Sequence, residues 1–548
     1  MGTLRERAGL LLWLALIVLP FSEARGQGTR TVLSSNPIYA DIDRLSELGL
    51  LDSIVIGQRP YSVREIIRIA GAARTRLNQR TGNSPGSVSA LEPIVSRLEA
   101  ASTDLEAGVG LSSLSGGWSA AINSTDAIRR SFSRPNNKPA EATIDPLAER
   151  RLGTPAARGQ VASLEAEQRL EPTTWAAFQT RERIDYGSQV ANGERGAALE
   201  LLIAEARVRY RNAAFAAGRR QFTWAQSAGD GLFLSSDAPA LDQVSLTADH
   251  PFLLPGFLRL AGPTQATLVI ADLGSSVVRS HSKLLTYKVS VQPSAAVELG
   301  GTFLDHYGGA GGRSSAFGNQ LIDFLPFIDV FRTHNYVDTT RTLDVDSDKA
   351  LGADGRIRLD RIGGVLLTGE ILLDDFDPRR IRQLLTSDGS QMAAITIPRI
   401  GTPALSLKLS AKHMGILTYT HLAISNGITT RGRLLGDELG PDAKSYSATL
   451  RAAPSEKLQL ELEGRSSIYS DADYAGRYVD AANTIWVVTK VAKRPDELRD
   501  LAVARLLMRL SPHYALTARG GLERTRNAYA VGGRRTDYVL GLALRAGM

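Results

Sequence analysis

The chain contains no cysteine. This absence excludes disulfide bonds, thiolate metal sites and cysteine nucleophiles. Aromatic residues make up only 6% of the 548 residues, and the formal net charge of +7 is small for this length. No basic run is interleaved with aromatic side chains, so the composition does not indicate a nucleic-acid partner. A mild positive charge is compatible with an anionic polysaccharide or with anionic lipid head groups.

Long apolar runs are also scarce. The first 26 residues combine Arg5 and Arg7, an apolar run at 10–19 and small residues that end at Ala24 or Gly26. This order predicts a secretory signal peptide at 1–26 that is cleaved on export. The alternative is a single membrane anchor, but the run is shorter than the roughly 20 residues a spanning helix needs. No later run reaches that length, so an integral membrane role would require a β-barrel.

Residues 27–107 have helical periodicity. Apolar side chains recur at helical spacing in three stretches, namely Ile38/Ile42/Leu45/Leu48, Ile66/Ile67/Ile69 and Leu91/Ile94/Val95/Leu98. Ser62 and Glu65 have the spacing of a capping box before the second stretch, and Gly49 is a stop signal after the first. We predict a small helical bundle. It weakly resembles one S-layer homology repeat, so a plug, a docking module and a cell-wall contact all remain open.

Residues 283–303 alternate apolar and polar side chains around a Gln-Pro-Ser turn. The alternation predicts a β-hairpin with Val289 and Leu299 on one face, and Lys288 and Glu298 on the other. In a soluble protein the apolar face would cover a core. In a transmembrane barrel it would face lipid, and the polar face would line the lumen. The period alone is compatible with both arrangements.

Similar alternations fill the region 108–548. Short turns built around proline occur at 292–294, 453–455 and 511–513, whereas long polar stretches rich in Gly and Asp occur at 305–320, 339–356 and 425–443. Short turns on one rim and long loops on the other are typical of outer-membrane barrels. The region is long enough for roughly 16 to 18 strands of about ten residues.

The polar faces of these predicted strands bring Arg and Glu to corresponding positions, as expected for a lumen crossed by ion pairs. Examples are Arg451, Glu461, Glu463, Arg465 and Arg505. We therefore predict a mainly β fold, a transmembrane antiparallel β-barrel of about 18 strands with a small N-terminal α-helical bundle. A large soluble β-domain is the alternative. The low aromatic content and the non-aromatic end "YVLGLALRAGM" are atypical of a barrel.

Four stretches resemble one known family, the Wzi-type capsule assembly proteins of the bacterial outer membrane. They are "GRRQFTWAQSAGDGLFLSSDAP" (218–239), "LPGFLRLAGP" (254–263), "QPSAAVELGGTFLDHYGGAGG" (292–312) and "LLTGEILLDDFD" (366–377). The resemblance implies an 18-stranded barrel with a periplasm-side helical bundle. It also implies a surface lectin that anchors capsular or other exopolysaccharide.

Two groups of residues are candidates for binding an acidic polysaccharide. Arg219, Arg220 and Trp224 could offer guanidinium groups and a stacking surface to a sugar. Arg431 and Arg433 lie in a predicted loop and could pair with its charges. A purely structural role inside the barrel is the alternative for the first group.

A second set is predicted to form ion pairs in the lumen: Glu205, Arg207, Arg209, Arg358, Glu370 and Asp374. Glu370 and Asp374 share one strand face, and paired carboxylates can act as acid and base in glycoside hydrolysis. Ion pairing with Arg356, Arg358 or Arg361 is the simpler interpretation.

No metal or cofactor site is predicted. Asp344, Asp346 and Asp348 open like a calcium loop, but Lys349 and Gly355 stand where an EF-hand needs Gly and Glu. An irregular calcium site in an external loop remains an alternative. No catalytic constellation is apparent, so we predict a non-enzymatic protein.

Three functions are therefore considered. The first is an outer-membrane lectin or anchor for anionic capsular or exopolysaccharide. The second is a porin-like channel, and the third is an envelope structural protein that contacts the cell wall through the helical module. The expected partners are the polysaccharide, outer-membrane lipid, and either peptidoglycan or periplasmic export machinery.

Overall fold

The structure is a computed structural model. It describes residues 29–34, 36–51, 53–81, 91–105, 109–122, 128–132, 140–144, 159–187, 196–226, 231–236, 238–275, 279–310, 347–374, 381–419, 427–431, 433–455, 457–470, 472–478, 486–493, 495–511, 513–527 and 533–547. The predicted signal peptide, Asp344 and Asp346 lie outside these residues.

In the described part of the chain, three helices precede the first strand: α2 (Ile38–Glu47), α3 (Val63–Thr81) and α5 (Glu92–Leu105). The apolar stripes anticipated from the sequence pack into one core that includes Ile42, Leu45, Ile66, Ile69, Val95 and Leu98. The Ser62 Oγ accepts a hydrogen bond from the Glu65 N–H at 3.2 Å, as a capping box requires. Gly49 follows α2 with a φ of +70°, a conformation that favours glycine at a helix end. We call residues 29–105 the helical module.

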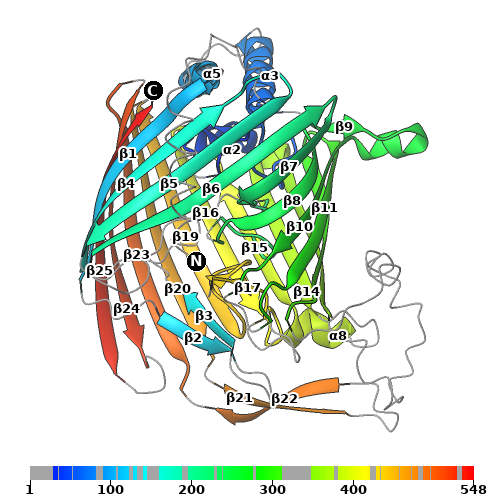
Figure 1. The fold of residues 1–548 in the computed structure, drawn as a ribbon, viewed down its shortest axis with the longest axis vertical. Helices are drawn as coiled ribbons and strands as arrows, with labels where there is room; N and C mark the ends of the chain where they lie inside the picture. Colours follow the sequence, from blue (N-terminus) through cyan, green and yellow to red (C-terminus); the bar gives the residue numbers. More distant parts are fainter. Residues whose placement is uncertain are drawn as a thin grey trace, which may run out of the picture.

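The remaining chain is dominated by one antiparallel sheet. Its main strands are β1 (Val109–Ile122), β4 (Gly159–Leu170), β5 (Ala176–Gly187), β6 (Gly196–Tyr210), β7 (Ala213–Arg220), β8 (Leu241–Ala248), β10 (Pro263–Asp272), β11 (Lys283–Ser294), β12 (Val297–Tyr307), β13 (Ser347–Leu359), β14 (Val365–Asp374), β15 (Ser390–Ile397), β16 (Leu405–Met414), β19 (Ala443–Ser455), β20 (Leu458–Tyr469), β23 (Glu497–Arg509), β24 (Tyr514–Arg526) and β25 (Arg534–Gly547). Each pairs with its neighbours in this order, and β1 pairs with both β4 and β25. The sheet is therefore a closed barrel (Figure 1).

The strand count matches the prediction. Nineteen strands belong to this sheet, and one of them, β9 (Phe252–Leu253), is a two-residue piece paired with the start of β10. The other eighteen form the wall in simple up-and-down order. Since every strand pairs on both sides, closure leaves no sheet edge in the described wall. The predicted fold class, a barrel of about 18 strands with an N-terminal helical bundle, is confirmed.

The apolar face of the strands points outward. In the hairpin at 283–303, Val289 and Leu299 are 43% and 48% exposed, whereas Lys288 and Glu298 are 1% and 0% exposed. The same holds at the end of the chain, where Leu540, Leu542 and Leu544 are exposed. An apolar exterior around a polar interior is the arrangement of a lipid-embedded barrel, and it is the inverse of a soluble domain.

The two ends of the barrel differ. At one end the strands are joined by short turns, such as those between β11 and β12 and between β19 and β20. The helical module lies at this end (Figure 1). There the Arg44 guanidinium donates to the carbonyls of Pro398, at 2.6 Å, and of Pro403, and it also donates to Glu47 at 2.9 Å. We call this the module end.

The opposite end carries the longer connections and is here called the loop end. The connections include the sheets β2 (Ile128–Phe132) with β3 (Ala140–Ile144), β17 (Thr429–Thr430) with β18 (Arg433–Leu434), and β21 (Ala472–Tyr478) with β22 (Trp486–Lys493), as well as α8 (Ile381–Gln383) and a π-helical turn (Leu384–Asp388). Short turns at one rim and long connections at the other agree with the asymmetry expected from the sequence.

One predicted loop is wrong in part. Residues 347–356 of the stretch 339–356 belong to β13. The wall is closely packed at this strand, because a Cβ on Gly352 would collide with the ring of Phe233. Asp354 pairs with Lys288 at 2.5 Å inside the barrel. The described half of the candidate calcium loop is therefore strand, not loop.

No helix in the described ranges is both long and apolar enough to cross a membrane.

Candidate functional site

The helical module is seated against the inner wall of the barrel. The buried carboxylate of Glu298 on β12 accepts hydrogen bonds from the backbone N–H groups of Ile56 and Gly57, at 2.9 and 2.8 Å. The side-chain amide of Gln58 donates to Ser290 Oγ at 3.0 Å. These contacts join polar groups that the strand pattern places in the lumen to the loop between α2 and α3. The module therefore occupies the lumen at its own end.

Two residues predicted for the lumen, Glu205 and Arg207, take part in fully buried ion pairs. The Arg220 Nε lies 3.3 Å from a carboxylate oxygen of Glu205. Arg207 pairs with Asp249 at 2.9 Å and donates to the carbonyl of Thr29 at 2.6 Å. Burial of such charges is tolerated because each has a partner of opposite sign nearby. Glu205 and Arg207 thus lie where the sequence placed them, and Arg207 also holds the start of the helical module.

A second ladder of ion pairs crosses β19, β20 and β23 on the other side of the lumen. Arg451 pairs with Glu461 at 2.6 Å, and Arg505 pairs with Glu461 and Glu463 at 2.9 and 2.8 Å. Arg465 lies 2.9 Å from Glu463. The alternating charges foreseen on these strand faces therefore meet across the strands.

Two other predicted members lie at the module-end rim. Arg209 donates to the carbonyls of Thr174 and Arg211, at 3.0 and 2.9 Å. Arg358 pairs with the exposed Asp360 at 2.8 Å. The predicted contacts of these arginines with carboxylates deep in the lumen are not the ones they make.

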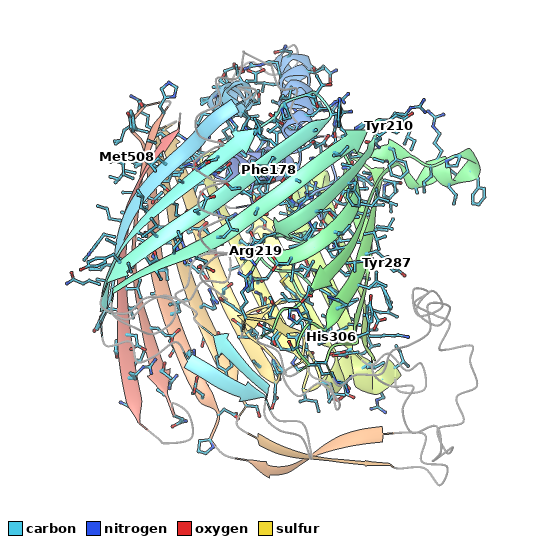
Figure 2. The ribbon with its side chains drawn as sticks, in the orientation of Figure 1. Phe178, Tyr210, Arg219, Tyr287, His306 and Met508 are labelled. Carbon is cyan, nitrogen blue, oxygen red and sulfur yellow. The ribbon has the colours of Figure 1, made fainter. Side chains whose placement is uncertain are left out.

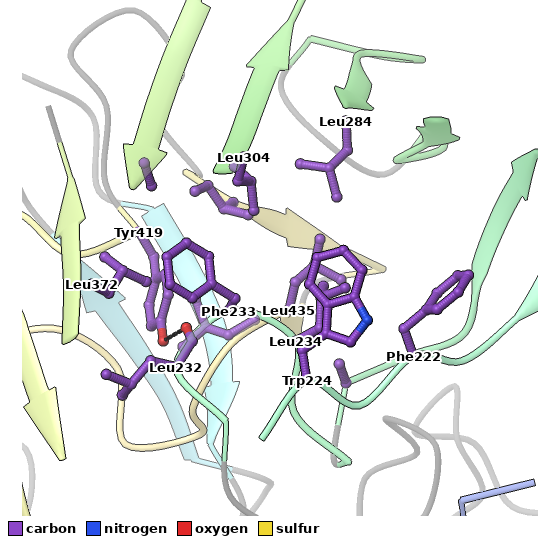
Figure 3. Packing of buried hydrophobic residues seen from close by; sticks show 14 of the residues in the cluster. Phe222, Trp224, Leu232, Phe233, Leu234, Leu284, Leu304, Leu372, Tyr419 and Leu435 are labelled. Carbon is purple, nitrogen blue, oxygen red and sulfur yellow. Dashed lines mark hydrogen bonds between the residues drawn. The ribbon is translucent and has the colours of Figure 1, made fainter. Parts of the chain in front are cut away.

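The lumen toward the loop end is filled by an apolar plug. The plug is built from the β7–β8 connection (221–226, 231–236, 238–240) and from the β16–β19 connection (415–419, 427–431, 433–442). Side chains of both connections pack with the inner wall in one buried cluster (Figure 3). The sequence did not indicate it, because neither segment has a repeating apolar pattern.

Hydrogen bonds tie the two halves of the plug together. The Tyr419 hydroxyl donates to the carbonyl of Leu232 (Figure 3) and accepts from the Asp437 N–H at 2.9 Å. The Ser235 N–H donates to the carbonyl of Leu435 at 3.0 Å. Burial raises the pKa of the Tyr419 phenol well above its usual value, which keeps this donor protonated. The plug is thus a specific structure as well as an apolar filling.

Glu370 and Asp374 fasten this plug to β14. Glu370 accepts hydrogen bonds from the N–H groups of Gln226 and Leu232, at 3.3 and 2.9 Å, and Asp374 accepts one from the N–H of Tyr419 at 2.8 Å. Each carboxylate thereby holds a different half of the plug. Glu370 and Asp374 do lie on one face of β14, as the sequence pattern indicated. There they accept hydrogen bonds from backbone N–H groups of the plug.

The arginine partners expected for these two carboxylates lie elsewhere. Arg356 lies 3.6 Å from Glu298, and Arg358 pairs with Asp360 at the rim. The expectation failed because a sequence pattern shows which residues face the lumen, but not which inserted segment will meet them.

Two of the candidate ligand residues are inaccessible. Trp224 is 1% exposed and packs in the plug, where its backbone N–H donates to the carbonyl of Leu234 at 2.9 Å. Arg220 lies over the ring of Phe222, 4.8 Å from its centroid, and pairs with Glu205. In this conformation neither side chain can reach a polymer outside the barrel, so the structural alternative holds for both.

Arg219 and Arg431 come together at the wall near the loop end. Arg219 makes a two-pronged pair with Asp242, at 2.7 and 2.8 Å, and is labelled in Figure 2. Arg431 lies 4.0 Å from Asp242 and 3.9 Å from Glu200. Burial, followed by the neighbouring Arg219, lowers the pKa of Arg431. Arg433 lies in β18, and nothing further is described for its side chain.

This charged group belongs to a row on the outer face of the wall. On β8, Asp242 lies on the same outward face as Val244, two residues nearer the loop end. On β10, Asp272 has the same relation to Ile270. Lys283 of β11 is paired with Asp272 at 2.6 Å. The outward face therefore changes from apolar to charged at this level. The sequence contains a signal for this change: on each strand it is the first charged residue at a position where the alternation would place an apolar one.

No group of three or more His, Asp or Glu side chains in the described ranges is arranged to hold a metal ion.

Comparison with known proteins gives two findings. Residues 131–356 match the family model of the capsule assembly protein Wzi. The chain is also similar to the solved structure of Wzi from Escherichia coli, an outer membrane protein involved in group 1 capsule assembly and a carbohydrate-binding β-barrel. That similarity has a TM-score of 0.66 at 14% identity and covers 94% of this chain and 98% of the other. The predicted resemblance is thus confirmed.

Two further proteins of known structure are much less similar to the chain. Acinetobacter baumannii OccAB1 has a TM-score of 0.42 at 9% identity, with 80% of this chain and 96% of the other covered. Pseudomonas aeruginosa OccD3 has a TM-score of 0.40 at 12% identity, with 80% and 93% covered. No curated protein matches the sequence.

The closed barrel with its lipid-facing exterior agrees with the predicted location in the bacterial outer membrane.

Proposed function

We propose that this chain, whose residues 131–356 match the Wzi capsule assembly family, is an outer-membrane surface lectin that attaches capsular or exopolysaccharide to the cell surface. The observation that carries the proposal is the filled lumen. The helical module occupies one end, and the apolar plug, held by Glu370 and Asp374, occupies the other. A barrel filled in this way acts through the surface it presents.

The proposed contact surface is the charged group around Arg431. It combines the guanidinium groups of Arg219 and Arg431 with the carboxylates of Asp242 and Glu200, and Arg433 lies two residues from Arg431. Guanidinium groups pair with sugar carboxylates, while carboxylates accept hydrogen bonds from sugar hydroxyls. This surface replaces the original candidates Arg220 and Trp224. We regard the binding as non-catalytic, because Glu370 and Asp374 are engaged with the plug.

The helical module is assigned to the periplasmic side in this proposal. It would be the part that meets peptidoglycan or export machinery, since the loop end would face outward. On α3, the Arg64 side chain is exposed and that of Arg76 is partly exposed. Outer-membrane lipid would contact the apolar exterior.

The test is binding of the folded, detergent-extracted protein to the purified surface polysaccharide of its host, with a salt titration. Arg431→Asn is the informative variant, because Arg431 has a φ of +51° and asparagine tolerates this conformation. We expect binding that weakens with salt and a roughly tenfold loss in the variant, equivalent to about 1.4 kcal/mol.

Arg358→Gln is the matched control, because it removes an arginine at the opposite rim. It should bind as the native protein does. A strain without the protein should also release stained glycan into the medium. Equal binding by all variants would refute the Arg431 surface, whereas no binding by the native protein, with an unchanged glycan layer in the deletion strain, would refute the lectin function itself.

A further inference from the structure

One connection at the module end leaves the barrel sideways. After β8 the chain forms β9, the short 3-10 helix η1 (Gly256–Ala261) and β10, and η1 projects away from the wall (Figure 1). Most connections at this end are turns of a few residues. This one makes an excursion, which we call the keel and define as residues 252–261.

The keel is apolar and uncovered. None of the six residues of η1 is buried, and Phe257 and Leu260 are 81% and 84% exposed. Leu253 and Leu258 are also exposed. Arg259 is the only charged residue between 252 and 261. Contiguous exposed apolar side chains on this scale mark an interaction surface, because water is a poor solvent for them.

The keel is held in a defined direction. Its two ends pair as strands, with Leu253 opposite Pro263. Gly262 has a φ of +76°, and its N–H donates to the carbonyl of Arg259 at 3.0 Å. A Cβ on Gly262 would collide with the carbonyl of Gln292 on β11, so only glycine permits this close approach. The base of the keel is therefore packed on the end of β11.

The keel continues the lipid-facing belt of the barrel. Leu246 on β8 and Phe215 on β7 are opposite one another and are both half exposed on the outer face. The connection between β8 and β10 begins where this belt ends. A projection that leaves the wall sideways at this level enters the boundary between acyl chains and head groups.

We propose that the keel inserts into the membrane leaflet at the module end and binds phospholipid. Phe257, Leu258 and Leu260 contact acyl chains, and the Arg259 guanidinium extends to a lipid phosphate. An interfacial element of this kind fixes the depth and tilt of the barrel in the bilayer. It acts independently of polysaccharide binding, which takes place at the other end.

The absence of cysteine allows a direct test in the full-length protein. Leu260→Cys and Phe257→Cys are labelled with an environment-sensitive fluorophore, and the folded protein is reconstituted in phosphatidylcholine–phosphatidylglycerol vesicles. Leu540→Cys, on the lipid-facing side of β25, is the positive control. Lys457→Cys, at an exposed turn of the same rim, is the control for water. Folding is verified for each variant by the heat-dependent mobility of the barrel on gels.

We expect both keel probes to emit at shorter wavelength than the Lys457 probe and to be quenched at least twofold by lipids brominated near the top of the acyl chain. Aqueous iodide should quench them less than it quenches the Lys457 probe. Emission and iodide quenching equal to those at Lys457 would overturn the proposal. Short-wavelength emission without quenching by brominated lipid would also overturn it, since the keel would then be covered by protein.

Discussion

At the scale of the residue, the carboxylates of β14 show how a barrel wall holds a plug. Glu370 and Asp374 face inward because they share the polar parity of the strand, and each accepts backbone N–H groups from one inserted segment. A buried N–H group that loses its acceptor carries a desolvation penalty, so the free energy of the plug depends on these two side chains. Single side chains of the wall thus position segments that lie far away in the sequence.

Glu370→Gln tests this role. The amide can accept only through its oxygen, and it places a donor against the N–H groups of Gln226 and Leu232. We expect a loss of about 1–3 kcal/mol in the stability of the plug. Limited proteolysis of the folded protein should cleave within 221–240 faster, while the barrel stays intact on gels.

Asp360→Asn is the control, because this carboxylate is exposed at the module-end rim. If Glu370→Gln and Asp360→Asn were cleaved at the same rate as the native protein, Glu370 would not hold the plug.

At the scale of the element, the helical module is closed by a clamp between α3 and α5. The guanidinium of Arg74 on α3 reaches two carboxylates of α5, Glu92 at 2.5 Å and Glu99 at 2.5 Å. The hydrogen bond from Arg74 lowers the pKa of Glu92. These three side chains are partly exposed to solvent, which screens their interaction. Their contribution to the free energy of unfolding is therefore about 1 kcal/mol or less.

The clamp should depend on pH with a definite sign. A carboxyl whose folded pKa lies below its unfolded value stabilises the fold above that unfolded value, about 4.3 for Glu, and loses this contribution as the pH falls through the folded pKa. We expect Arg74→Gln to speed amide hydrogen exchange in α5 by up to about fivefold at neutral pH. The difference from the native protein should shrink in acid.

Arg76→Gln provides the comparison, because Arg76 donates to Gln79 on the same helix. A pH-independent difference for Arg74→Gln, or an equal effect of Arg76→Gln, would show that the clamp is not electrostatic.

At the scale of the whole molecule, the barrel resembles a porin in its wall but not in its interior. The helical module enters the lumen from one end and the apolar plug from the other, and buried ion pairs lie on the inner face of the wall. The buried cluster of the plug includes Trp224, Phe233 and Leu435, which are held by side chains from the wall itself. We expect an interior packed in this way to conduct neither ions nor solutes.

The protein reconstituted in planar bilayers should therefore show no steady current under conditions in which a general porin conducts. Membrane insertion is verified separately by protection of the barrel from protease. A steady ohmic current from inserted native protein would contradict the filled lumen and would favour the porin-like channel.

The sequence by itself determined the class of fold and the direction of each strand face. A period of two fixes which side chains share a face, and the lack of long apolar helices, together with ion-pairing charges on the polar faces, indicates that the polar side is the interior. The helices of the module could also be predicted from the sequence, because an apolar stripe at 3.6-residue spacing and a capping box are local signals. Glu205 and Arg207 lie on the polar face of β6 for this reason.

Only the tertiary structure decided what fills the lumen and what remains exposed. The described parts of the β7–β8 and β16–β19 connections carry no periodic pattern, so their insertion depends on contacts between distant segments. That insertion removed Trp224 from the surface and assigned Glu370 and Asp374 to the plug. It is also closure of the barrel that brings Arg431 beside Asp242 and Glu200, because residues so far apart in sequence become neighbours only when the wall and its loops are assembled.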